Sequence, residues 1–151
     1  MNHDEIDHET ANTQELETQL IALMLLADIG EVKKVFRIVD GLCFIFRPEA
    51  KLFIEIRRAA LRDDNPFGPI DTSPIMAAAS KDPEIMRAHV RAMGRLNVNV
   101  QNLMTVAEAV AFAGKKRYAS ERLRRVSSEV NAGDVSTEVA SQQLRKLSDD
   151  L

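Results

Sequence analysis

Apolar residues along most of this chain recur at intervals of three and four positions, which is the spacing of one face of an α-helix. The first such series consists of Leu16, Leu20, Leu23, Met24 and Ala27. Neighbouring apolar residues widen that face, so the pattern predicts a helix at the centre of the core. Thr13 is its candidate N-cap. Residues 1–11 carry four acids and little to bury, and we expect a disordered acidic leader there.

Four more short helices are predicted before residue 98. The second covers about 32–39 after a break at Gly30, and the third starts at Pro48, a residue suited to a first helical turn. The polar, proline-rich stretch 63–69 is predicted to be a loop. The fourth and fifth helices cover about 74–80 and 83–93. In the fifth, the pattern puts these residues inside: Ile85, Met86, His89, Val90 and Met93.

The short apolar run 42–46 has the composition of a strand. No partner strand is evident elsewhere, and a lone strand leaves its backbone groups unpaired. We therefore predict a buried turn, with Cys43 as a small buried hydrophobe.

The C-terminal third is predicted to be a helical hairpin. A long helix over about 100–130, broken at Gly114, is followed by a turn and an amphipathic helix over 135–147, which should pack back antiparallel. The predicted fold is therefore all-α: a compact bundle of short helices over 12–97, followed by a hairpin and linker over 98–151.

Composition narrows the class further. The 151 residues suit one domain, and the 45% hydrophobic content is that of a globular protein. The N-terminus lacks the features of a signal peptide, and no apolar run approaches the length of a membrane span. With a single cysteine, no internal disulfide can form. We expect a soluble, cytoplasmic protein without a membrane partner.

No pattern for catalysis is present. The six glycines form no phosphate-binding loop, and Gly114 with Lys115 and Lys116 lacks both the upstream glycine and the hydroxyl of that motif. The three histidines show no zinc-like spacing. We expect no enzymatic activity, no cofactor and no metal site in this chain.

One charge cluster stands out against the net charge of −3. Six cations fall within eleven residues: Lys115, Lys116, Arg117, Arg122, Arg124 and Arg125. On a helix they spread over more than one face, so a solvated surface explains them as well as an acidic protein partner or a nucleic-acid backbone does. Without interleaved aromatics, base stacking is not supported, and DNA binding is expected to be weak.

The order of these features resembles the N-terminal domain and helical linker of DnaB-type replicative helicases. The segment Glu15–Leu26 is similar to that family's first helix. Asp40–Phe46 followed by Arg47–Ile56 is similar to its acid, aromatic, x-Pro segment, and Pro69-Ile70-Asp71 matches the tripeptide before its next helix. Ile21-Ala22 replaces the family's Gly-Gly, as in a divergent member from a phage or mobile element.

The resemblance implies an interaction module. In that family, hairpins pair the domains into dimers, the dimers form a collar on the hexameric ring, and the collar contacts primase or a loader. The motor of that family lies in a C-terminal domain that is missing from these 151 residues, so the resemblance implies either the non-catalytic front part of a longer helicase or a free-standing homologue. We therefore expect self-association into a dimer or higher oligomer, and binding to a replicative helicase, primase or helicase loader.

The predicted interface is the apolar stripe of the 98–130 region. Its members are Leu103, Val106, Val110, Tyr118, Leu123, Val126 and Val130. Two alternatives stay open: a nucleic-acid-binding helical protein that uses the 115–125 cluster, and an unrelated helical partner domain, for example of a transcriptional or toxin–antitoxin system.

Overall fold

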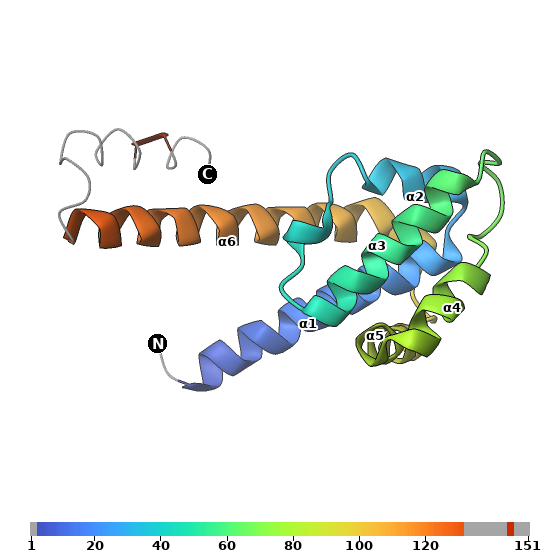
Figure 1. The fold of residues 1–151 in the computed structure, drawn as a ribbon, viewed down its shortest axis with the longest axis horizontal. Coiled ribbons are helices and arrows are strands. Elements are labelled where there is room, and N and C mark those ends of the chain that lie inside the picture. Colours follow the sequence, from blue (N-terminus) through green and yellow to red (C-terminus); the bar gives the residue numbers. More distant parts are fainter. Residues whose placement is uncertain (1–2, 132–144, 147–151) are drawn as a thin grey trace. The chain divides into compact units, whose positions relative to one another are not determined.

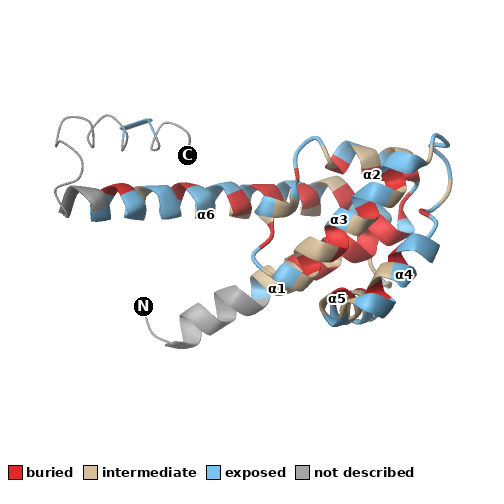
Figure 2. Ribbon diagram, viewed as in Figure 1, coloured by how far each residue is buried: buried red, intermediate tan, exposed pale blue. Residues whose placement is uncertain are grey.

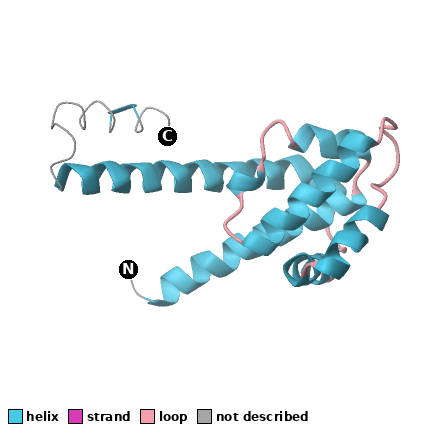
Figure 3. Ribbon diagram, in the orientation of Figure 1, coloured by secondary structure: helices cyan, strands magenta, loops and turns pink. Residues whose placement is uncertain are grey.

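The computed structural model describes residues 3–131 and 145–146 (Figure 1). Every regular element in that part of the chain is helical, as Figure 3 shows, which confirms the all-α fold class. The chain divides into two compact units, Met1–Ala111 and Phe112–Leu151. Among the described residues, no helix combines the length and apolar character that crossing a bilayer requires.

The first unit is built around one central helix. Its elements are α1 His3–Leu26, α2 Ile29–Val35, η1 Gly41–Cys43, α3 Arg47–Arg62, α4 Ser73–Lys81, α5 Pro83–Met93 and η2 Val100–Asn102. The central helix, α3, packs against α1, α2, α4 and α5. The last helix, α6 Leu103–Asn131, begins in this unit and continues into the second.

The core confirms the predicted importance of the first helix. Residues 20–25 of α1 are all buried (Figure 2), so the helix is surrounded by other elements over this stretch. Phe53 of α3 is fully buried, and its ring lies 5.8 Å from that of Phe36 and 4.9 Å from that of Phe44. These contacts join α2, η1 and α3 into one apolar cluster.

The predicted start of α1 near Thr13 is wrong. The helix begins at His3 and includes the stretch that we expected to be a disordered leader. The sequence permits this, because no proline or glycine precedes Leu26.

Contrary to the prediction from the sequence, Gly30 does not break a helix. It lies in the first turn of α2, and its N–H donates a hydrogen bond to Pro66 O at 2.9 Å. A Cβ at this position would lie 3.2 Å from both Pro66 Cβ and Pro66 O. The glycine therefore permits the 63–69 loop to approach α2 closely.

The 41–46 segment is a turn, as predicted, but it is buried only in part. Gly41–Cys43 forms one 3-10 turn, Phe44 is buried and Cys43 is half-buried. Leu42 is 84% exposed and Ile45 46% exposed, which corrects the expectation of a buried run.

The buried face of α5 also differs from the prediction. Ile85, Ala88 and Ala92 are buried, whereas Val90 and Met93 are 62% and 49% exposed. Because alanine side chains are small, the face of α5 that carries Ala88 and Ala92 can approach neighbouring helices closely. This face is therefore buried, and the face with the bulkier Val90 and Met93 is exposed.

α6 continues through Gly114 without the predicted break. An isolated glycine costs a helix only about 1 kcal/mol relative to alanine, which the rest of α6 tolerates. The second helix of the expected hairpin, 135–147, lies outside the described residues except for 145–146. The hairpin therefore stays a prediction.

Candidate functional site

The predicted interface stripe divides between the two units. In the first unit, Leu103 and Val110 are 3% and 1% exposed and belong to the core, and Val106 is half-buried against it. A buried side chain cannot form an exposed interface, so Leu103 and Val110 must be removed from the candidate surface.

Beyond Ala111 the helix presents other side chains. Phe112 and Tyr118 are 67% and 57% exposed and Leu123 is half-buried, whereas Val126 is buried and must also be removed from the candidate surface. The side chain of Val130 lies outside the described residues. Phe112 was not among the predicted interface residues, because residue type and spacing do not distinguish an exposed phenylalanine from a buried one.

The basic cluster is exposed but does not form a single stripe. Five of its members are exposed and Arg117 is half-buried; the exposed ones are Lys115, Lys116, Arg122, Arg124 and Arg125. At 100° per residue, Lys115 and Arg122 share one side of α6, and Arg124 lies on nearly the opposite side.

Arg122 and Tyr118 form one local unit on α6. Arg122 Nη1 donates a hydrogen bond to Tyr118 Oη at 3.1 Å, and its guanidinium carbon lies 5.8 Å from the centre of the tyrosine ring. The stacked pair presents an aromatic surface and a positive charge together, a combination typical of interfaces between proteins.

The ion pairs of the first unit join its helices. Lys51 Nζ lies 2.9 Å from Asp82 Oδ2 and 3.0 Å from Glu84 Oε1, which ties α3 to the start of α5. Arg95 contacts both carboxylate oxygens of Glu15, at 2.6 and 3.0 Å, which ties the segment after α5 to α1. These carboxylates therefore stabilise the packing of the helices.

The pKa shifts follow from the same contacts. The hydrogen bond from Arg95 lowers the pKa of Glu15, and the one from Lys51 lowers the pKa of Asp82. The pKa of Asp71 is lowered by the Ser73 backbone N–H that it accepts at the start of α4. No cluster of three potential metal-ligating residues occurs in the described part of the chain.

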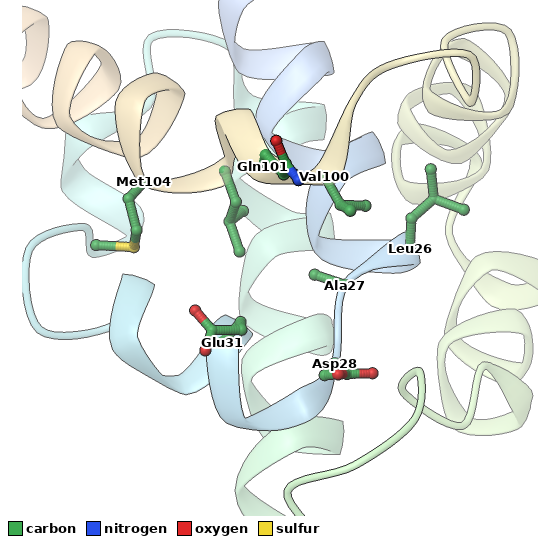
Figure 4. Close-up of a pocket in the computed structure, with 8 residues that line it drawn as sticks. Leu26, Ala27, Asp28, Glu31, Val100, Gln101 and Met104 are labelled. Atoms are coloured by element: carbon green, nitrogen blue, oxygen red, sulfur yellow. The ribbon is translucent and has the colours of Figure 1, made fainter.

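A groove of about 320 Å³ lies between the α1–α2 junction and the η2–α6 junction of the first unit (Figure 4). Its apolar lining includes Leu26 and Val100, which are 40% and 43% exposed. Its two acids are already engaged: Asp28 Oδ1 accepts from Gly68 N at 3.1 Å, and Glu31 pairs with Lys34 at 2.9 Å. The groove is therefore suited to holding an apolar side chain.

Comparison of the chain with protein-family models, with curated proteins and with solved structures gave no match.

Proposed function

We propose that this chain is a protein-interaction module of the DNA-replication machinery. In this proposal it self-associates through the part of α6 beyond Ala111, binds a replicative helicase, primase or helicase loader, and performs no chemistry of its own. The observation that carries the proposal is the pair of exposed aromatic rings, Phe112 and Tyr118, on a helix rich in cations. Aromatic and arginine side chains are the residues most enriched among energetically important interface contacts.

Two further observations support this function. The ionisable groups with shifted pKa values in the first unit take part in ion pairs and helix caps, so the contacts of the fold account for these shifts. Two of the stretches on which the helicase resemblance rests lie at helix starts: Arg47-Pro48 opens α3, and Asp71 Oδ1 accepts from Ser73 N at 3.0 Å where α4 begins.

Sedimentation of the whole chain at rising concentration tests the self-association. We expect the sedimentation coefficient to increase with concentration, and the variant with Phe112→Glu and Tyr118→Glu to remain monomeric. Phe67→Glu is the matched control, because Phe67 is 75% exposed on a loop of the first unit. A wild-type chain that stays monomeric at all concentrations would contradict self-association. Pull-down of purified helicase, primase and loader by the tagged chain tests partner binding separately.

The exposed cations Lys115, Lys116, Arg124 and Arg125 favour one alternative, in which α6 binds a nucleic-acid backbone. This alternative predicts binding that weakens steeply as salt increases, with loss on charge reversal of Arg124 and Arg125. Absence of DNA binding at low salt would exclude it.

A further inference from the structure

The outer face of α3, in the first unit, mixes apolar and cationic side chains. Helical spacing places six residues on it: Arg47, Ile54, Arg57, Arg58, Leu61 and Arg62. Ile54 and Leu61 are 40% and 56% exposed, although the opposite face of the same helix carries fully buried side chains such as Phe53 and Ile56. We refer to these six residues as the α3 outer face.

Neighbouring elements extend this surface. The Arg57 guanidinium carbon lies 5.9 Å from the centre of the Phe36 ring, so the end of α2 borders the α3 outer face on one side. A Cβ on Gly41 would lie 3.5 Å from Ile54 Cδ1, so η1 also abuts it. Arg37 and Ile38, which follow Phe36 in the chain, are both exposed and add one more cation and one more apolar side chain.

Most of the positive charge here is not used in holding the fold together. Arg58 pairs with Glu55 at 2.8 Å, and Arg47 lies 3.5 Å from Glu84. Within the described part of the chain, Arg37, Arg57 and Arg62 have no carboxylate at ion-pair distance. This excess of cations occurs in a chain whose net charge is −3.

The composition of the surface distinguishes between classes of partner. Binding to a phosphate backbone depends mainly on cations and needs no apolar surface, and binding of single-stranded nucleic acid typically adds aromatic rings for stacking. The α3 outer face offers aliphatic Ile54 and Leu61 between its cations, and Phe36 nearby is half-buried with Arg57 over its ring. Aliphatic surface bordered by arginine matches a peptide that carries both apolar side chains and carboxylates.

We propose that the α3 outer face binds an acidic amphipathic segment of a partner protein. Apolar side chains of that segment pack on Ile54 and Leu61, and its carboxylates pair with Arg37, Arg57 and Arg62. The inference is independent of self-association through α6, because all of these residues lie in the first unit.

Fluorescence anisotropy with a labelled peptide of alternating aspartate and leucine tests the proposal. The comparison probes are the same peptide with serine for leucine, the same peptide with lysine for aspartate, and a thymine oligonucleotide. We expect the aspartate–leucine peptide to bind the whole chain at least about tenfold more tightly than any comparison probe, because only that peptide satisfies both features of the surface. No binding of this peptide, or equal binding of the serine peptide or the oligonucleotide, would overturn the proposal.

Variants locate the binding surface. Arg57→Glu with Arg62→Glu, and separately Ile54→Ser with Leu61→Ser, should each weaken peptide binding at least about tenfold. Lys81→Glu with Arg87→Glu, on α4 and α5, is the matched control, since it makes the same charge change at exposed positions off the α3 outer face and should leave affinity unchanged. The altered side chains are all exposed, and thermal unfolding followed by circular dichroism checks that each variant folds. Equal loss in this control would show that net charge, and not the α3 outer face, governs binding.

Discussion

The Glu49 carboxylate of α3 is 1% exposed, and its Oε1 accepts a hydrogen bond from Arg91 Nε of α5 at 2.7 Å. A buried charge of this kind fixes the register of two helices, because sliding either helix would leave the carboxylate without its cation. The pair thus adds specificity to the packing of α5 against α3.

Arg91→Ala should lower the free energy of unfolding by about 3 kcal/mol, because it leaves the Glu49 carboxylate buried without a counter-charge. Urea denaturation measures the change. Arg87→Ala, one turn earlier on α5, is the control, since Arg87 is exposed and forms no ion pair among the described residues; its effect should stay within about 0.5 kcal/mol. Equal effects of the two substitutions would show that the buried pair contributes nothing specific.

Glu17 of α1 caps the start of α3. Its two carboxylate oxygens accept hydrogen bonds from the backbone N–H groups of Ile45 and Phe46, each at 3.1 Å. Phe46 is the N-cap residue and has no side-chain acceptor of its own. Glu17→Ala should therefore cost about 1–3 kcal/mol and speed amide hydrogen exchange at these two residues. Glu108→Ala, at an exposed position of α6, should change neither quantity.

Stability should fall at acidic pH through Glu15 and Asp82. Arg95 holds the pKa of Glu15 below its ordinary value of 4.5, and Lys51 holds that of Asp82 below 3.8. A carboxyl group with a lowered folded-state pKa stabilises the fold above its unfolded pKa, and this contribution is lost as pH falls through the folded value. Urea midpoints should therefore decrease as pH falls below about 4.5.

In the variant Arg95→Gln the urea midpoint should decrease less as pH falls, whereas Arg87→Gln should show the same decrease as the wild type. The stability contributed by Lys51 depends on pH in the opposite direction. The hydrogen bond to Asp82 raises the pKa of Lys51, so this stability is lost only as pH rises above 10.5. An acid limb that is identical in wild type and Arg95→Gln would contradict the role of the Glu15–Arg95 pair.

Gly30→Ala should destabilise the protein by about 1 kcal/mol, although alanine favours helices. The new Cβ would lie 3.2 Å from the Pro66 backbone oxygen, and moving the loop away would weaken the hydrogen bond from Gly30 N to that oxygen. Gly94→Ala is the control, because Gly94 has a helical φ of −73° and its Cβ would meet nothing closer than 3.4 Å. Thermal unfolding of both variants should show a lower midpoint for Gly30→Ala alone.

Leu103 and Phe112 should respond oppositely to substitution. Leu103→Ala empties a core position and should cost about 2–4 kcal/mol, while Phe112→Ala should change stability by less than about 0.5 kcal/mol and reduce self-association instead. Denaturation and sedimentation, measured on both variants, separate the two effects. A large loss of stability in Phe112→Ala would show that this ring is part of the core.

Sequence spacing located the third, fourth and fifth helices, although it misplaced the start of α1, the bounds of α2 and a break in α6. The Pro48 start of α3, the 63–69 loop and the starts of α4 and α5 were all predicted, because proline, capping aspartates and apolar periodicity act locally. The predicted buried face of α5 was wrong for the opposite reason. Ala88 and Ala92 are buried because other helices pack against them, and the local pattern of residues does not encode that contact.

The interaction surfaces also combine features that the local sequence predicts with features that depend on tertiary packing. Residue type and spacing were enough to predict an all-α chain, a first helix with a deeply buried segment and a cationic stretch at 115–125. Packing between distant residues made Leu103 and Val110 part of the core, left Phe112 exposed, and left Ile54 and Leu61 exposed among the arginines of α3. Exposure depends on what packs against a side chain, and that is a property of contacts between residues far apart in the chain.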